Sequence, residues 1–166
     1  MSSNVSKGLL VVISGPSGAG KGTVCKELMK RYNYNISVSA TTRPPREGEV
    51  DGVNYYFLDK NTFEQKLHNG EFLEYAQVYG NYYGTLKREV EEKLDNGENI
   101  ILEIDIQGTL QVQKVYKNAV YVFLLPPSIS ELRNRILKRG SETESSFNIR
   151  FSSVSEELKY MGSYDY

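Results

Sequence analysis

A glycine-rich segment between a strand-like run and a helix-like stretch constrains the fold of this chain more than any other feature. Residues 9–13 form a continuous aliphatic run, which is typical of a parallel strand buried on both faces. Residues 21–32 carry Val24, Leu28 and Met29 on one face and predict a helix. The glycines between these elements let successive N–H groups turn toward phosphate oxygens, and the helix N-terminus adds its positive dipole. This order of elements predicts a phosphate-binding loop.

The predicted loop is expected to hold the phosphates of a nucleotide. Its residues are Gly15, Pro16, Ser17, Gly18, Ala19, Gly20, Lys21, Gly22 and Thr23, and the ammonium of Lys21 is expected to reach the terminal phosphates. The position after the lysine usually carries a Ser or Thr that binds Mg²⁺, but Gly22 stands there and Thr23 follows. Two alternatives stay open. Either Thr23 supplies the hydroxyl, or waters and phosphates hold most of the Mg²⁺ shell, because this ion dehydrates reluctantly.

The rest of the chain alternates strand-like and helix-like segments, which is typical of an α/β protein. Residues 100–104 and 119–125 predict two more buried strands, making three central parallel strands, and residues 86–94, 128–138 and 145–160 predict helices. Short strand-like pieces lie at 36–42, 53–58 and 71–78, and eight of the 13 tyrosines fall between Tyr32 and Tyr83. This segment indicates a small lobe that lines a wet pocket, since a half-buried tyrosine keeps its hydroxyl paired. Alternatively, tyrosine is present only because it forms strands well.

Composition excludes several classes of function. With 20 Lys and Arg against 21 Asp and Glu, the chain has no global basic field, so we expect it to bind neither nucleic acid nor a membrane. No apolar run approaches the roughly 18 residues that cross a bilayer, and residues 1–7 lack the pattern of a secretory signal, so we expect a cytoplasmic protein. Cys25 is expected to be a buried helix residue and His68 a solvated helix end. Neither has a second Cys or His nearby, so a zinc or iron site built by the protein is not expected.

A series of motifs spanning nearly the whole chain resembles guanylate kinases in order and spacing. The motifs lie at residues 15–23, 37–49, 51–55, 71–74, 80–85, 104–108 and 139–144. The resemblance implies a P-loop nucleoside monophosphate kinase that moves the γ-phosphoryl group of ATP, bound with Mg²⁺, to GMP. It also implies an α/β fold with a parallel core sheet flanked by helices, a small mixed-sheet GMP-binding lobe and a helical lid. In a single domain of residues 1–166, the core is expected at about 1–35, 86–127 and 151–166, the lobe at 36–85 and the lid at 128–150.

The same resemblance assigns roles to residues. Matching positions for the GMP phosphate are Arg43, Arg46, Tyr55 and Tyr83, and matching positions for the guanine base are Ser39, Glu74 and Thr85. Asp105 matches a residue near Lys21, the metal and the substrates, and Arg135, Arg139 and Arg150 match the arginines of the lid. The residues expected to act in catalysis are therefore Lys21, Arg43, Asp105, Arg135, Arg139 and Arg150. Glu103 either shares the role of Asp105 or pairs with a structural partner, and Arg133 and Lys138 are expected to be solvated.

The chemistry of guanine explains why a glutamate suits the base site. Guanine presents two adjacent donors, N1–H and the exocyclic amine, and an ionised carboxylate only accepts hydrogen bonds. Glu74 can therefore take both donors at once, while a hydroxyl of Thr85 or Ser39 answers the remaining groups. Adenine would place the lone pair of its N1 opposite the carboxylate. Alternatively, Glu74 is a solvated strand residue.

Two other functions are considered, a scaffolding module and a kinase that acts on another nucleotide. Guanylate-kinase-like domains also serve as scaffolding modules in which the catalytic loop has decayed, but Lys21, Arg43 and Arg46 are present here. The order Gly22–Thr23 resembles adenylate kinase, but the remaining motifs favour guanine over AMP or dTMP. Members of the resembled family continue past a Tyr-Asp-Tyr segment into another strand and a helix, so we expect the chain to be C-terminally incomplete at Tyr166.

Overall fold

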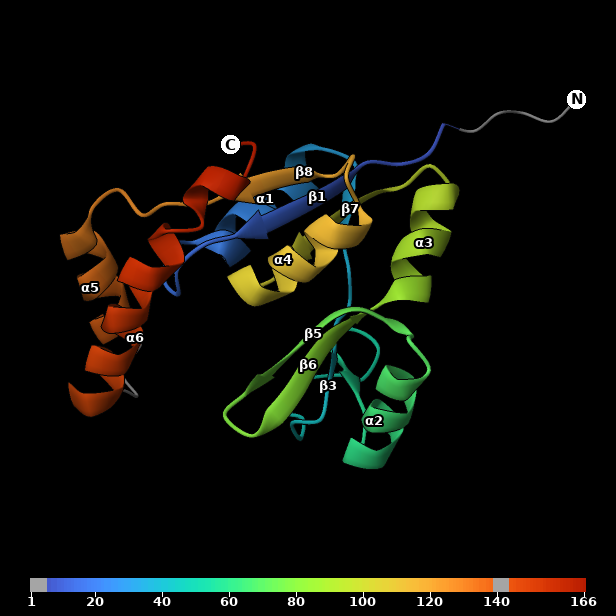
Figure 1. The fold of residues 1–166 in the computed structure, drawn as a ribbon, viewed down its shortest axis with the longest axis horizontal. Coiled ribbons are helices and arrows are strands. Elements are labelled where there is room, and N and C mark those ends of the chain that lie inside the picture. The colour runs from blue at the N-terminus through green and yellow to red at the C-terminus, as the bar shows by residue number, and fades with distance from the viewer. Residues whose placement is uncertain (1–5, 139–143) are drawn as a thin grey trace, which may run out of the picture.

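Four parallel strands form the central sheet (Figure 1). The computed structural model describes residues 6–138 and 144–166. Strand β1 (Leu10–Ser14) lies between β7 (Asn99–Glu103) and β8 (Val120–Phe123), and β2 (Tyr34–Ile36) pairs with the outer edge of β7. Every residue of β1 is buried, which confirms that the aliphatic run is a strand covered on both faces.

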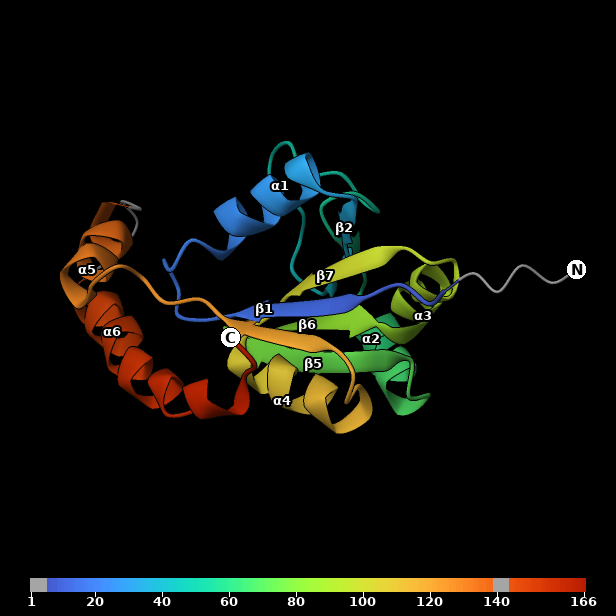
Figure 2. The same cartoon turned by 90° about the horizontal axis from the view of Figure 1, so that it is seen from above.

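Helices cover both faces of this sheet, as Figure 2 shows. On one face α1 (Lys21–Arg31) packs Val24, Cys25, Leu28 and Met29 against β1 and β7. On the other face lie α3 (Lys87–Asp95) and α4 (Ile106–Val115), whose buried side chains join those of the three central strands in a second cluster. Cys25 is 1% exposed, as expected for a buried helix residue.

A second, mixed sheet stands beside the first. Its order is β4 (Tyr56–Phe57), β3 (Ala40–Thr41), β6 (Asn81–Leu86) and β5 (Phe72–Val78), with β3 parallel to β4 and antiparallel to β6, and β6 antiparallel to β5. Helix α2 (Lys60–His68) packs on this sheet through Phe63, whose ring stacks on Phe72 at 4.3 Å and on Tyr82 at 5.1 Å between centroids. His68 is the exposed last residue of α2, as predicted.

Two helices stand beyond the carboxyl end of β1 (Figures 1 and 2). They are α5 (Ile129–Lys138) and α6 (Glu144–Leu158), which pack together through Leu132, Ile136 and Val154. Ser128 caps the start of α5, where the amide of Glu131 donates to its Oγ at 3.0 Å. A 3₁₀ turn (Met161–Ser163) follows α6, and the last residues then run along β8, with the amide of Phe123 donating to the carbonyl of Tyr166.

The structure corrects the interpretation of residues 36–42 as one strand. The three predicted parallel strands are present as β7, β1 and β8, and β2 adds a fourth strand that was not expected. Ile36 ends β2 of the parallel sheet, whereas Ala40 and Thr41 form β3 of the other sheet. The strand β2 has three residues at the edge of the core sheet, so it needs no long apolar run. The piece predicted at 53–58 shortens to β4. The sequence interpretation did not recognise α4 or β6, and it recognised α2 only by its end at His68. None of the helices described is long and apolar enough to span a bilayer.

Candidate functional site

The predicted phosphate loop connects β1 to α1, and its glycines adopt conformations that other residues rarely reach. Gly20, which precedes the helix, has φ 98°, in the left-handed region. Gly15 has φ 142°, and a Cβ placed there would lie 2.3 Å from the carbonyl oxygen of Leu124. The side chain of Lys21 folds back over the loop, and its Nζ donates to the carbonyl oxygens of Gly15 at 2.7 Å and Pro16 at 3.1 Å. The loop is thus a tight turn that carries an ammonium group above its own backbone.

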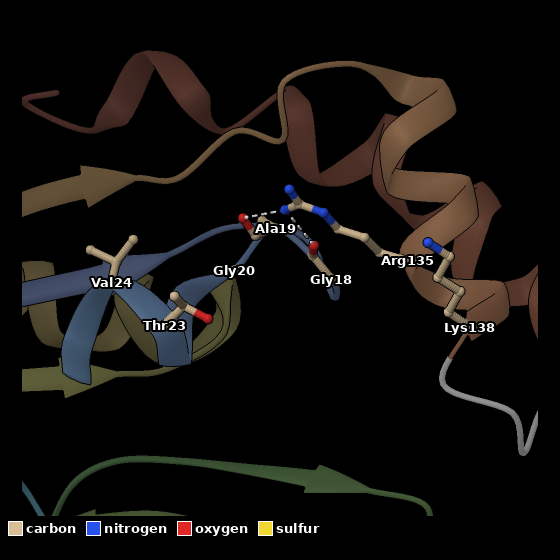
Figure 3. A pocket seen from close by; sticks show the side chains of 7 residues that line it. All are labelled: Gly18, Ala19, Gly20, Thr23, Val24, Arg135 and Lys138. Carbon is tan, nitrogen blue, oxygen red and sulfur yellow. Dashed lines mark hydrogen bonds between the residues drawn. The ribbon is translucent and has the colours of Figure 1, made fainter. Parts of the chain in front are cut away.

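A cavity lies on either side of this loop. The first, of about 490 Å³ and here called the loop cavity, is lined by Gly18, Ala19, Gly20, Thr23, Val24, Arg135 and Lys138 (Figure 3). The second, of about 480 Å³ and here called the lobe cavity, is lined by Ser17, Lys21, Ser39, Tyr55, Glu74, Ala76, Val78, Tyr83, Gly84, Glu103, Ile104 and Asp105. Residues of one loop therefore form part of the wall of both cavities.

The loop cavity is closed on one side by cations from α5. Arg135 extends from that helix to the loop, where its Nη1 lies 3.4 Å from the carbonyl oxygens of Gly18 and Ala19 (Figure 3). Glu131, one turn earlier, accepts from Nε of Arg135 at 2.8 Å and orients the guanidinium. Lys138, which we expected to be solvated, is exposed and also lines this cavity.

Arg139 and Arg150 are the other two arginines expected in the lid. Arg139 is outside the described residues. Arg150 lies in α6, and its side chain is not among those described.

The lobe cavity contains a buried carboxylate. Glu74 of β5 is 5% exposed, so it is not the solvated strand residue of the alternative interpretation. Its Oε1 accepts a hydrogen bond of 2.7 Å from Oγ1 of Thr85, which is fully buried on β6. Its Oε2 lies against the backbone of Gly108, where an added Cβ would stand 2.4 Å away. Burial raises the pKa of Glu74 to about 7; the hydrogen bond from Thr85 opposes the rise and the negative charge of Asp105 adds to it.

Asp105 has a structural task as well as a place in the lobe cavity. It caps α4, where its Oδ1 accepts from the amide of Gly108 at 2.8 Å. The carboxylates of Asp105 and Glu103 line the lobe cavity together with Lys21. Two acids and one ammonium at the carboxyl ends of β1 and β7 form the kind of polar edge where ligands bind in open α/β sheets.

An arginine and two tyrosines meet at the far side of the lobe cavity. The guanidinium of Arg43 lies 5.4 Å from the ring centroid of Tyr55, and the rings of Tyr55 and Tyr83 meet edge to face at 6.1 Å. Glu49 raises the pKa of Arg43 by hydrogen bonding, and Tyr83 contributes to the same rise. Arg46 is exposed, and its amide donates to Oε2 of Glu49 at 2.7 Å.

Most of the residues that the resemblance assigns to GMP therefore lie together. Ser39, Tyr55, Glu74, Tyr83 and Asp105 line the same cavity, along with Lys21 of the loop. Thr85 stands behind Glu74 and Arg43 stands beside the tyrosines. Arg46 does not line that cavity.

Sequence reasoning missed several residues of the site. Ala76 and Val78 share the cavity with Glu74, and the strand period of two, counted along β5 from Glu74, would have found them. Glu49 and Gly108 lie within the recognised motifs but received no role. Glu157 of α6 also received none; burial raises its pKa, and the charge of Lys21 opposes that rise.

A metal cage made by the protein is absent from the described residues, since no three His, Cys, Asp or Glu side chains there are arranged to hold an ion. Thr23 lines the loop cavity with Arg135, away from the two acids of the lobe cavity. The position that usually bears the hydroxyl is Gly22, where a Cβ would lie 3.7 Å from Oε1 of Glu103. One carboxylate and one hydroxyl near a phosphate loop suit Mg²⁺ that arrives on a nucleotide, because this ion keeps several waters and phosphate ligands.

Comparison with known proteins gives one consistent result. The family model described as guanylate kinase matches residues 7–166. The chain is 59% identical to guanylate kinase of Clostridium tetani over 96% of its own length and 77% of that protein, and 56% identical to the one of Clostridioides difficile over 98% and 80%. Its fold is similar to the crystal structure of guanylate kinase from Anaplasma phagocytophilum, with a TM-score of 0.75, 34% identity and coverage of 97% of this chain and 76% of that one.

Proposed function

The chain belongs to the guanylate kinase family and transfers a phosphoryl group from ATP to GMP, and from that premise we propose which of its residues hold the two nucleotides. GMP binds in the lobe cavity, and ATP binds from the loop cavity with its phosphates on residues 15–23. The observation that carries this assignment is the position of the loop: Ser17 and Lys21 line the lobe cavity, whereas Gly18, Gly20 and Thr23 line the loop cavity. Phosphoryl transfer needs donor and acceptor in line, and a wall shared by both sites brings their phosphates together.

The guanine base binds against Glu74. The ionised carboxylate accepts from N1–H and from the exocyclic amine of guanine, with Thr85 fixing its orientation from behind and Ser39 and Asp105 bordering the base site. A buried acceptor of this kind rejects bases that leave it unpaired by up to roughly 10⁴-fold. The preference for GMP over AMP therefore rests mainly on one side chain.

The phosphate of GMP binds at Arg43, Tyr55 and Tyr83, with Arg46 approaching from the exposed segment before Glu49. Arginine suits this task because its planar fork matches two phosphate oxygens at once. Lys21, Arg135, Arg139 and Arg150 neutralise the charge that is shared by the two nucleotides during transfer. Such positioning and charge stabilisation supply nearly all of the catalysis that this reaction needs.

Magnesium accompanies ATP in this proposal. When bound, the ion neutralises phosphate charge and orients the transferring group. Either Thr23 on the loop cavity side or the carboxylates of Glu103 and Asp105 on the lobe cavity side would supply a ligand, with nucleotide phosphates and waters making up most of the shell.

The organisation and setting of the enzyme follow the same proposal. The GMP-binding lobe is formed by about residues 36–85 and the lid by about 128–150, and the core is formed by about 1–35, 86–127 and 151–166. A cytoplasmic location suits the unpaired thiol of Cys25 and gives access to both nucleotides.

A crossed binding experiment tests the assignment of the two cavities. Glu74→Gln and Arg135→Ala would each be titrated by calorimetry with GMP alone and with a non-hydrolysable ATP analogue alone. Glu74→Gln is expected to weaken GMP and leave the ATP analogue unchanged, and Arg135→Ala is expected to do the reverse. Loss of the same ligand in both variants would show that the cavities are not separate sites.

A further inference from the structure

Glu49 forms an ion pair with Arg43, the arginine that the proposed function places at the GMP phosphate. Its Oε1 accepts from Nη2 of Arg43 at 2.9 Å and its Oε2 from Nη1 at 3.0 Å, so carboxylate and guanidinium meet fork to fork. Neither side chain is well exposed: that of Arg43 is 12% exposed and that of Glu49 is 19% exposed. A pair screened from water in this way holds its geometry better than the exposed ion pairs of the helices.

The remaining contacts fix both partners from other directions. Oε2 of Glu49 also accepts from the amide of Arg46 at 2.7 Å, which ties the carboxylate to the backbone. The guanidinium lies near the rings of Tyr55 and Phe57, with distances of 5.4 and 5.9 Å to their centroids. The planar group of Arg43 is therefore located by a carboxylate at one edge and by aromatic rings beside it.

Counting donors shows which edge of the guanidinium is left for a ligand. Both N–H groups of Nη1 are engaged, one by Glu49 and one by the carbonyl oxygen of Pro44 at 2.8 Å, and one N–H of Nη2 is engaged by Glu49. The other two of the five donors are Nε–H and the second N–H of Nη2. These two donors lie on the same edge of the plane and are spaced to bind two oxygens of one phosphate. Tyr83, which lines the lobe cavity, raises the pKa of Arg43 by hydrogen bonding, so its hydroxyl stands at this same edge, beside the place proposed for the phosphate.

We propose that Glu49 is a positioning residue for GMP: it holds the far edge of the Arg43 guanidinium so that the Nε–Nη2 edge faces the phosphate. This inference rests on the proposed function, which places the GMP phosphate at Arg43. The role differs from that of a direct ligand, because a carboxylate would repel the phosphate if it touched it. Holding Arg43 in place before GMP arrives lowers the entropy cost of ordering a long side chain at binding.

A competing hypothesis is that Glu49 hinders the binding of GMP, and the same experiment decides between the two. A carboxylate on an arginine resembles a bound phosphate, so Glu49 could act as a competitor that GMP must displace. In that case its removal would tighten the binding of GMP. The donor count favours positioning, because a two-oxygen edge remains while the pair is intact.

The experiment compares GMP with guanosine, which lacks the phosphate. Glu49→Gln removes the charge and one acceptor at nearly constant size, and Glu47→Gln makes the same change at an exposed glutamate two residues away. Dissociation constants for both ligands would be measured by calorimetry for the parent and each variant. We expect Glu49→Gln to weaken GMP by about tenfold, as for loss of a charge-assisted hydrogen bond, and to leave guanosine within about twofold. Glu47→Gln is expected to change neither.

A double-mutant cycle with Arg43→Ala shows whether Glu49 acts through the arginine. In the Arg43→Ala background, the change Glu49→Gln is expected to have almost no further effect on GMP, because the group it positions is gone. Full additivity of the two changes would overturn the inference. So would tighter GMP binding in Glu49→Gln, unchanged GMP binding, or an equal loss of GMP and guanosine, which would make Glu49 a structural residue of the lobe.

The two variants distinguish a wrong role for Glu49 from a wrong position of the phosphate site. If Glu49→Gln leaves GMP binding unchanged while Arg43→Ala weakens it, the positioning role is wrong and the phosphate site stands. If Arg43→Ala itself leaves GMP binding unchanged, the phosphate site was misplaced and the inference is wrong with it.

Discussion

Thr85 donates its single hydroxyl proton to Oε1 of Glu74 across 2.7 Å, and both side chains are shut off from solvent. The bond fixes the carboxylate in one orientation and leaves its acceptor capacity toward the lobe cavity. Burial meanwhile raises the pKa of Glu74 to about 7, so near neutral pH this group is close to the balance between its two protonation states. Guanine requires the ionised form, because only that form accepts from two donors.

Replacing Glu74 by Gln should lower kcat/KM for GMP by at least roughly tenfold, from the about 1–3 kcal/mol cost of an unpaired buried group. The amide presents a donor to one of the guanine N–H groups. The loss on IMP should be smaller, because its base has a single donor on this edge. Steady-state kinetics with both nucleotides check the prediction, with KM for ATP as the internal control. Equal activity of variant and parent on GMP would place the base site elsewhere.

The stability of the ligand-free enzyme should fall as pH rises through the titration of Glu74. Its pKa is about 7 when folded and about 4.5 in the unfolded chain, so between these values the folded state binds more protons. The free energy of unfolding therefore decreases over that window, by up to about 3 kcal/mol. Urea unfolding of parent and Glu74→Gln at about pH 5 and pH 8 measures this. The free energy of unfolding of the variant should rise relative to that of the parent at the higher pH. A difference that stays constant between the two pH values would contradict the raised pKa of Glu74.

Gly108→Ala should impair GMP binding without harming the fold. The new Cβ would stand 2.4 Å from Oε2 of Glu74, and the end of that flexible side chain would have to move. An alanine inside α4 would otherwise favour the helix by up to about 1 kcal/mol. We expect a raised KM for GMP with an unchanged or slightly raised melting temperature. Gly162→Ala, where a Cβ would meet nothing within 4 Å, is the matched control and should leave KM unaltered.

Lys21→Met should abolish turnover while the fold stays intact. The change keeps the length and bulk of the side chain but removes the ammonium that lies over Gly15 and Pro16. Without it, the adjoining phosphates of ATP and GMP lose their shared counterion. Turnover assays combined with circular dichroism separate the two roles. A loss of helical signal would instead show that Lys21 is needed for folding.

The thiol of Cys25 should be inert in the native enzyme. It is 1% exposed in α1, and burial raises its pKa to about 12, so almost no thiolate forms at neutral pH. An aromatic disulfide reagent at about pH 8 should react with one thiol per chain only after denaturant is added. Rapid reaction of the folded enzyme would mean that α1 opens on the timescale of the assay.

Sequence patterns predicted the parts of this fold that depend on local structure. The strand, loop and helix around Lys21 follow from an aliphatic run, glycines and helical spacing, and all three are present. The division between β2 and β3 depends instead on which sheet each short strand joins, and that choice is made by partners such as Ile101 and Tyr83, far along the chain.

The candidate site divides in the same way. Motif resemblance predicted site roles for Glu74 and Arg43, but the residues that contact them are brought there by tertiary structure. Gly108 is recognisable only once α4 lies against β5, and Glu49 only once its carboxylate is seen on the guanidinium. The hydroxyl of Thr85 was expected at the base, whereas its proton is donated to Oε1 of Glu74.

The loop that lines both cavities is expected to couple the binding of the two substrates. In the proposed arrangement a nucleotide on either side contacts the same loop, and the phosphates of both lie near the ammonium of Lys21, so the two binding equilibria are expected to be linked. Linkage is reciprocal: the factor by which GMP alters the dissociation constant of ATP equals the factor by which ATP alters that of GMP. A substitution anywhere in residues 15–23 is thus felt in both affinities, whereas a change in β5 alters the GMP affinity first and reaches ATP only through this exchange.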